Sequence, residues 1–146
     1  MKPSSETNVL TPQTRINVRD IAYIAGFIDG EGTISGTIAS SGQLDIIVTA
    51  ANTCKETLVW IQSKVGGMLY NHNRSNVKIR WKPGYIWRCS SINRIELLKR
   101  LIPHLKQKQK QAHKALAILG MIKTGQAKDR IERAIQQLQA MNKRGR

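Results

Sequence analysis

Acidic residues and cysteines are scarce in this chain of 146 residues, and long apolar runs are absent from it. The two cysteines, Cys54 and Cys89, lie far apart and neither belongs to a Cys-x-x-Cys pair, so the sequence supports neither a zinc site nor a disulfide framework. This pattern predicts a reducing compartment. The sequence also contains no stretch long enough for a membrane span, no secretory signal pattern and no lipidation motif.

Basic residues dominate the charge. Twenty-four Lys and Arg stand against nine Asp and Glu, which gives a net charge of +15. Such an excess favours a polyanionic partner, with nucleic acid as the first candidate and a membrane surface as the second. The three histidines, His72, His104 and His113, are scattered and indicate surface residues rather than metal ligands. The length suits one well-buried domain, and we find no internal repeat.

Periodicity along the chain predicts an α+β domain with helices on one face of an antiparallel sheet. Residues 1–18 are polar and show no period, which predicts a mobile N-terminal arm before a single domain at 19–146. Alternating apolar and polar residues predict strands at 33–40, 43–49, 68–73, 77–82 and 85–91. Helical spacing predicts further helices at 55–65, 93–102, 109–122 and 126–141.

The stretch 21–32 has the pattern of a short helix with acids at its end. Asp20 is expected to cap the N-terminus, and Ile24 and Ile28 belong to an apolar stripe at helical spacing. Gly30 is suited to end the helix in a left-handed turn. The stretch is therefore expected to bury one face in the core of its own chain.

A second stripe of the same helix consists of small residues. Ala22, Gly26 and Gly30 recur at every fourth position, so another helix can approach this backbone closely. Glycine in the middle of a helix costs roughly 1 kcal/mol relative to alanine. We therefore interpret Gly26 as a sign that something packs against this face.

Two carboxylates, Asp29 and Glu31, lie where this helix ends. The negative end of a helix dipole disfavours acids, so the pair predicts a bound cation. Asp29 has an alternative interpretation, because Asp at a turn often accepts hydrogen bonds from local backbone. That alternative leaves Glu31 unexplained.

The nine residues 24–32 resemble the LAGLIDADG motif of the homing endonucleases, since the apolar spacing, three glycines and both acids occur in the same order. The resemblance covers most of the chain, from about Asp20 to Leu119. It implies the αββαββα fold with a saddle-shaped antiparallel sheet, here with additional C-terminal helices. Because the motif occurs once, it also implies a homodimer and a roughly palindromic target. The expected interface residues are Ala22, Gly26, Phe27, Asp29 and Gly30.

The resemblance implies double-strand cleavage of DNA by metal-assisted phosphodiester hydrolysis. Glu31 matches the metal-binding acid, with the backbone carbonyl of Gly30 as a helper; Mg²⁺ is the expected cofactor, and Mn²⁺ is expected to support cleavage as well. Magnesium commonly binds through one or two carboxylates plus phosphates and waters, so one acid per chain suffices. Lys108 lies in a lysine- and glutamine-rich run that on its own indicates a solvated basic turn, but it matches the active-site lysine of the family.

The sequence departs from the common family pattern at three positions. Glu31 replaces the more usual Asp. Ala50 stands where some members have a water-positioning Gln, which leaves Asn52 as the nearest polar candidate. Cys54 stands where a basic residue is common, with Lys55 next to it. The predicted catalytic residues are Glu31, Lys108 and Asn52.

Polar strand faces are the predicted DNA-reading surface, with a solvated sheet face as the alternative. The strand at 77–82 places three cations on one face, which suits phosphates and base edges in a major groove. Arg80 and Arg88 are suited to bidentate reading of guanine, whereas Lys78 and Lys82 are equally suited to phosphate contacts. The residues expected to contact DNA are Ser35, Thr37, Gln43, Asp45, Asn71, Asn73, Lys78, Arg80, Lys82 and Arg88.

Binding proteins without catalysis are the competing interpretation. An intron RNA-binding maturase, a DNA-binding regulator or a ribosome-associated protein would each account for the charge. The presence of both Glu31 and Lys108 favours the nuclease. Single-motif members are usually encoded in introns of organelles or microbes. We therefore expect an intracellular protein of a chloroplast, a mitochondrion, or a bacterial or archaeal cytoplasm.

Overall fold

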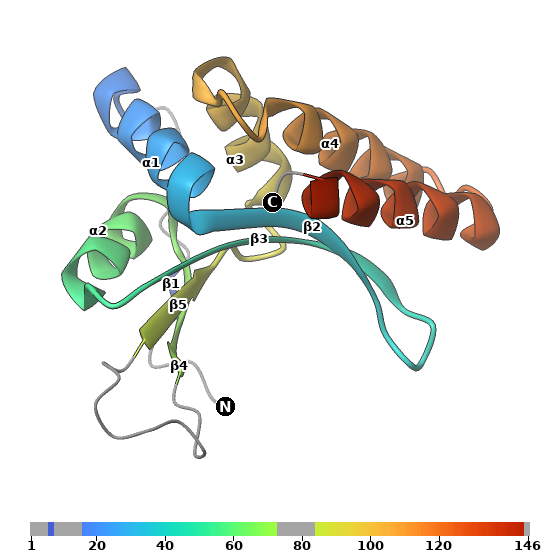
Figure 1. Cartoon of the computed structure of the whole chain (residues 1–146), viewed down its shortest axis with the longest axis horizontal. Coiled ribbons are helices and arrows are strands. Elements are labelled where there is room, and N and C mark those ends of the chain that lie inside the picture. Colours follow the sequence, from blue (N-terminus) through green and yellow to red (C-terminus); the bar gives the residue numbers. More distant parts are fainter. Residues whose placement is uncertain (1–5, 8–15, 73–83, 145–146) are drawn as a thin grey trace.

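A five-stranded antiparallel sheet, with strand order β1-β4-β5-β3-β2, forms the base of the structure. The computed structural model describes residues 6–7, 16–72 and 84–144. Figure 1 shows that the helices gather on one face of the sheet, above the arch of its longest strands. The elements are β1 Glu6–Thr7, α1 Val18–Glu31, β2 Gly32–Ile38, β3 Leu44–Asn52, α2 Lys55–Val65, β4 Gly67–His72, β5 Gly84–Arg88, α3 Arg94–Leu101, a 3-10 turn Ile102–His104, α4 Gln109–Lys123 and α5 Lys128–Arg144.

This architecture confirms the predicted α+β class and the order of its elements. The two C-terminal helices also begin and end within three residues of their predicted positions at 109–122 and 126–141. Part of the N-terminal segment differs from the expected arm, because β1 pairs with β4 through Glu6 and Met68. The basic strand expected at 77–82 lies outside the described residues. No helix in the described ranges is long and apolar enough to cross a bilayer.

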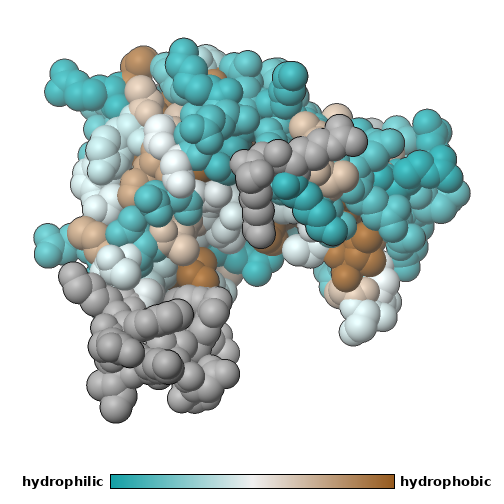
Figure 2. All heavy atoms as spheres, in the orientation of Figure 1, coloured by the Kyte–Doolittle hydropathy of each residue, from teal (hydrophilic) through white to brown (hydrophobic). Residues whose placement is uncertain are grey.

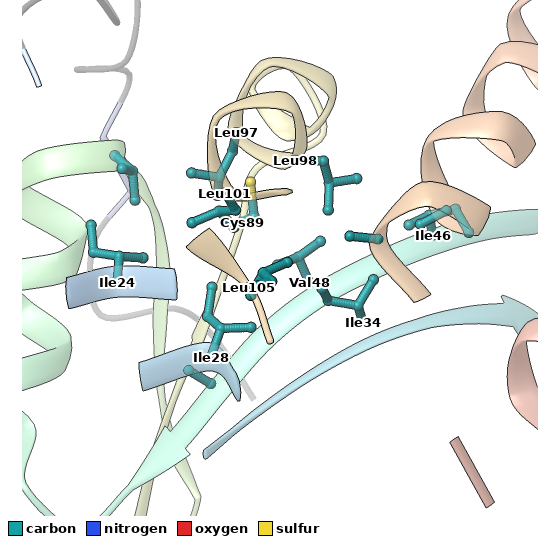
Figure 3. Packing of buried hydrophobic residues seen from close by; sticks show 14 of the residues in the cluster. Ile24, Ile28, Ile34, Ile46, Val48, Cys89, Leu97, Leu98, Leu101 and Leu105 are labelled. Atoms are coloured by element: carbon teal, nitrogen blue, oxygen red, sulfur yellow. The ribbon is translucent and has the colours of Figure 1, made fainter. Parts of the chain in front are cut away.

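The core lies between the helices and the sheet. Figure 3 shows Ile24 and Ile28 of α1 pointing toward Val48 of β3 and toward the leucines of α3 and its following turn. Ile24, Ile28 and Val48 are all completely buried. Burying one such side chain contributes about 1.5–3 kcal/mol, so this layer fixes α1 firmly on the sheet.

Both ends of α1 differ in detail from the prediction. Asn17 caps the N-terminus, since its side-chain oxygen accepts the Asp20 amide at 2.8 Å. Asp20 instead lies in the first turn, where an acid is favourable, and pairs with Lys64 at 3.3 Å. At the other end the helix continues through Glu31, and Gly32 leaves it in an extended conformation with φ −109°. The expected left-handed turn at Gly30 is therefore wrong.

Gly32 is required by close packing rather than by its φ angle. A Cβ at this position would lie 2.7 Å from the carbonyl oxygen of Thr49 and 2.9 Å from the backbone of Ile28. Both neighbours are backbone atoms, so neither can turn aside as a side chain would. Glycine thus allows α1 to pass directly into β2 beside β3, which sets Glu31 at the junction of helix and sheet.

Helix α5 covers the free edge of β2. Gln139 donates to the carbonyl oxygen of Gly36 at 3.0 Å, and Asn142 donates to that of Ile34 at 3.0 Å. Gly36 also leaves room for Ile135, whose Cγ2 would lie 2.6 Å from a Cβ at that position. An exposed strand edge invites pairing with other chains, so this cover satisfies the edge within the fold.

Arg94 likewise hydrogen-bonds the backbone at the edge of β3. Strand β5 pairs with β3 from Asn52 to Thr49, and the Cys89 amide adds a bond to Val48 at 2.9 Å. Beyond that point Arg94 donates to the carbonyl oxygen of Ile46 at 2.8 Å and to the carboxylate of Asp45 at 2.6 Å. The ion pair thus takes the place of a neighbouring strand.

Two glycine substitutions should have opposite effects on stability. Gly32→Ala should lower the free energy of unfolding by about 1–3 kcal/mol, because the new methyl overlaps backbone atoms. Gly120→Ala in α4 should raise it by up to about 1 kcal/mol, because, apart from its own helix backbone and chain neighbours, the new Cβ has no atom of the described residues within 4 Å. Urea unfolding of both variants measures this difference, and equal effects would contradict it.

Candidate active site

Asp29 joins the end of α1 to the segment before α4. Its side chain is buried, with 8% of the residue exposed. One carboxylate oxygen accepts the amide of Lys106 at 2.6 Å, and the other accepts the amide of Lys108 at 3.0 Å. The acid therefore hydrogen-bonds backbone, as the alternative interpretation had it, but backbone 77 and 79 residues away.

Lys108 completes this connection in the opposite direction. Its ammonium group donates to the backbone carbonyl of Asp29 at 2.7 Å. That carbonyl lies at the negative end of α1, where a cation is favourable. We call these three hydrogen bonds between Asp29 and residues 106–108 the Asp29 clamp. The clamp therefore holds the ammonium group of Lys108 at the carbonyl of Asp29, which precedes Glu31 by two residues in the sequence.

Neighbouring contacts fix the segment that enters the clamp. Leu105 is buried in the core, and its amide donates to the carbonyl oxygen of Leu101 at 3.1 Å. Gln109 donates from its side chain to the carbonyl oxygen of Ile102 at 2.8 Å. The run that looked like a solvated basic turn is therefore anchored at both ends of the clamp.

Glu31 has an environment unlike that of Asp29. It is the last residue of α1 and is exposed. Within residues 6–7, 16–72 and 84–144 its carboxylate makes no hydrogen bond and no ion pair. In a chain with 24 basic and nine acidic residues, an acid at a helix C-terminus without a basic partner remains available to an external cation.

The oxygen donors at the end of α1 suit a magnesium ion. Among the described residues no three His, Cys, Asp or Glu side chains gather into a metal-binding group. Glu31 therefore contributes a single carboxylate, and the backbone carbonyl of the adjoining Gly30 is a second oxygen donor. Magnesium is typically held by one or two carboxylates together with substrate phosphates and waters, so these residues fit that ion.

The two polar residues nearest to the positions that depart from the family pattern are Asn52, at the end of β3, and Lys55, at the start of α2. Ala50 pairs with Gly32 across the sheet and is buried toward the helices, so its side chain does not reach the open side. Asn52 accepts the amide of Cys54 at 2.8 Å and so shapes the turn into α2. Its catalytic role stays a prediction. Lys55 lies over the ring of Tyr85, 5.6 Å from its centroid.

The two thiols have different environments. Cys54 is exposed, and the Thr57 hydroxyl, 3.4 Å from its sulfur, lowers the pKa of the thiol. Burial raises the pKa of Cys89 to about 12. Cys89 therefore acts as a core residue, and only Cys54 is available to solvent.

Strand pairing places several of the predicted DNA contacts on one face. Ile34, Ile46 and Val48 are buried toward the helices, so the alternating residues lie on the opposite, open face. Ser35 and Thr37 lie on this open face. Arg88 also lies there, because it pairs with Thr49 on β3.

The remaining predicted contacts are placed differently. Asn71 lies on the same side of β4 as the buried Leu69, so its assignment to the open face is wrong. Asp45 is paired with Arg94, which competes with any contact to DNA. Gln43 is exposed in the turn between β2 and β3. Asn73, Lys78, Arg80 and Lys82 lie outside the described residues.

The open face also has apolar members, which the sequence prediction of DNA contacts left out. The pairing that places Arg88 there also places Ile47, Ile86, Met68 and Tyr70 there. Alternation along each strand was the available signal, since Ile47 lies between two core positions and Ile86 lies beside the buried Trp87. Only polar residues had been selected as reading groups.

The outer face of α1 carries Gly26 and Gly30, two of the residues predicted to lie in a contact between helices, and that contact stays a prediction. Asp29, predicted for the same contact, is instead buried against residues 106–108 of its own chain. A Cβ at Gly26 or Gly30 would meet no atom of the described residues within 4 Å, apart from the backbone of its own helix. Nothing within this part of the chain therefore requires glycine there. Phe27 stacks on Tyr23 at 6.5 Å, and Tyr23 is 54% exposed. Figure 2 shows some hydrophobic, brown atoms at the upper left, where α1 lies in Figure 1, among white and teal ones.

A hollow of about 390 Å³ lies between α1 and α2, near the N-terminal half of α1. It is therefore at the opposite end of the helix from Glu31 and is separate from the candidate active site. Its lining residues are Arg19, Asp20, Tyr23, Glu56, Thr57 and Trp60.

Comparison with known proteins gives matches among solved structures. No protein-family model matches the sequence, and no curated protein matches it. The archaeal intron-encoded homing endonuclease I-Vdi141I, solved with DNA, is 19% identical with a TM-score of 0.69, covering 84% of each chain. The homing endonuclease I-CvuI, solved with the I-CreI target and Mg, is 20% identical with a TM-score of 0.67, covering 84% of this chain and 82% of that one. The LAGLIDADG meganuclease I-AabMI, bound to uncleaved DNA, is 21% identical with a TM-score of 0.52, covering 75% of this chain and 38% of that one.

The two acids of the motif should respond differently to truncation. Asp29→Ala should lower the free energy of unfolding by about 2–4 kcal/mol, because it removes a charged acceptor from two amides. Glu31→Ala is the matched control and should change it by less than about 0.5 kcal/mol, because this side chain is exposed. Denaturant unfolding tests both, and a large loss in the Glu31 variant would contradict the assignment.

Proposed function

We propose that this chain, which has the fold of the LAGLIDADG homing endonucleases, is a site-specific DNA endonuclease that depends on a divalent metal. The proposal rests on an acid and a cation that lie at the same end of α1. Glu31 is exposed at the helix end, while the Asp29 clamp holds the ammonium group of Lys108 beside the same end. A binding protein would need neither group in this arrangement.

The residues would divide the work of phosphodiester hydrolysis. Glu31 and the carbonyl oxygen of Gly30 would hold Mg²⁺. When bound, the ion supplies a Lewis acid that stabilises charge on phosphate oxygens and activates water. Lys108, whose ammonium group is held at the Asp29 carbonyl, would supply positive charge where negative charge develops on the phosphate. Asn52, which shapes the turn at the end of β3, is the proposed water-orienting residue.

The exposed position of Glu31 suits the longer acid. Glutamate has one more methylene than the usual aspartate, so its carboxylate extends further from the helix. Exposure at the last residue of α1 leaves room for that reach.

Two copies of the chain are needed to cut both strands of a duplex, because each copy supplies one such acid. The face of α1 that carries Gly26 and Gly30 is the proposed contact, since helices can approach most closely where no side chain intervenes. A twofold dimer contacts itself through the same surface on both copies, and its DNA target would be roughly palindromic. An intron-encoded origin and an intracellular location are proposed together with this function.

Loss of the carboxylate charge should abolish cleavage and spare binding. Wild type is expected to make Mg²⁺-dependent double-strand cuts in a supercoiled library of palindromic sites, whereas Glu31→Gln should bind without cutting. Glu56→Gln, which changes an exposed acid of α2, is the control and should cut like wild type. Continued cutting by Glu31→Gln, or tight binding of a structured RNA with no DNA cleavage, would refute the proposed activity.

A bulky residue in the proposed contact should separate the two copies. Gly26→Leu should shift the protein from dimer to monomer in sedimentation velocity and abolish double-strand cutting, because the side chain holds the two helices apart. Gly120→Leu introduces the same group on an exposed glycine of α4 and should remain dimeric. A dimer in both variants would place the interface elsewhere.

A further inference from the structure

The open face of the sheet carries apolar side chains that the core does not use. Ile47 of β3 and Ile86 of β5 lie on this face and are only half-buried. Met68 and Tyr70 of β4 lie beside them, and the Tyr70 hydroxyl donates to the sulfur of Met68 at 3.2 Å. A face selected only for solubility or for phosphate contacts would not need these groups.

Strand register orders the face into rows across the sheet. Residues directly opposite one another in antiparallel strands lie on the same face, so each row is a set of neighbours. The central row contains Arg88, and the two rows beside it contain Ile47 and Ile86. The rows are Ser35 and Ile47; then Thr33, Thr49, Arg88 and Met68; then Ala51, Ile86 and Tyr70.

The chemistry of these rows matches particular base edges in a major groove. Guanine presents two acceptors, N7 and O6, which an arginine can contact together. Thymine presents a methyl group, which an apolar side chain can cover. Isoleucine would leave the hydrogen-bonding groups of the other major-groove edges without partners, so an isoleucine that faces the groove would favour thymine.

The spacing of the rows predicts the spacing of the bases. Successive residues on one face of a strand are about 6.8 Å apart, because each residue advances about 3.4 Å. Base pairs also rise by about 3.4 Å, so neighbouring rows address positions roughly two base pairs apart. We propose that Arg88 reads a guanine in each half-site and that Ile86 and Ile47 read thymine methyl groups about two base pairs to either side of it. This inference rests on the proposed function, because it assumes that the open face lies against DNA.

Removal of single methyl groups tests the inference. The Glu31→Gln protein, which should leave DNA uncut, is used to select binding sites from a pool of randomised duplexes. Each thymine of the selected half-site is then replaced by deoxyuridine, which lacks only the methyl. Affinity should fall by about fourfold at two positions, the effect of one methyl returned to water.

Variants assign each methyl to its side chain. With Ile86→Ala added, deoxyuridine should matter at only one of the two positions, and with Ile47→Ala only at the other. Val59→Ala, an exposed apolar residue of α2, is the matched control and should leave both effects intact. Failure to select any site would refute the proposed function. Selected sites that ignore methyl removal, or that respond equally in all variants, would overturn this inference alone.

Discussion

The candidate site depends on the two hydrogen bonds that the Asp29 carboxylate accepts from the backbone amides of Lys106 and Lys108, just before α4. An acid at the C-terminal end of a helix is disfavoured by about 0.3–1 kcal/mol. Each amide that donates to a charged acceptor contributes about 1.5–3 kcal/mol, so the two bonds at 2.6 and 3.0 Å outweigh that penalty. The return bond from Lys108 to the Asp29 carbonyl then adds a cation at the same helix end.

The clamp separates two roles that the sequence presents as one acid pair. Asp29 is buried and holds the chain together, whereas Glu31 is exposed and faces outward from the same helix end. Gly32 fixes the direction in which that end leaves the core, because β3 passes too close for any side chain. Near this junction, side chains take up backbone carbonyls at strand edges: Gln139 of α5 binds Gly36 of β2, and Arg94 binds Ile46 of β3. The face of the sheet opposite the helices is left open.

The spacing of apolar residues along the chain predicted the helices and strands, because these elements depend on residues close together in sequence. The helix at 21–32, the alternation in β2 and β3, and the C-terminal helices all follow from apolar spacing, and Glu31 stood out because acids are rare at helix ends. The partners of Asp29 lie 77 and 79 residues away, and Arg94 lies 49 residues from Asp45. Contacts over such distances leave no periodic trace. The N-cap at Asn17 and the extended exit at Gly32 were missed for another reason, because neighbouring Asp20 and Gly30 satisfy the same local rules.

The most direct test of the account is the position of a divalent metal in a crystal of the protein with a selected DNA duplex. Mn²⁺ can be located by its anomalous scattering and takes oxygen ligands as Mg²⁺ does. The account predicts a peak coordinated by the Glu31 carboxylate, close to a DNA phosphate, where two copies of α1 meet. A structure with DNA on the open face but with Mn²⁺ bound only away from Glu31 would contradict it.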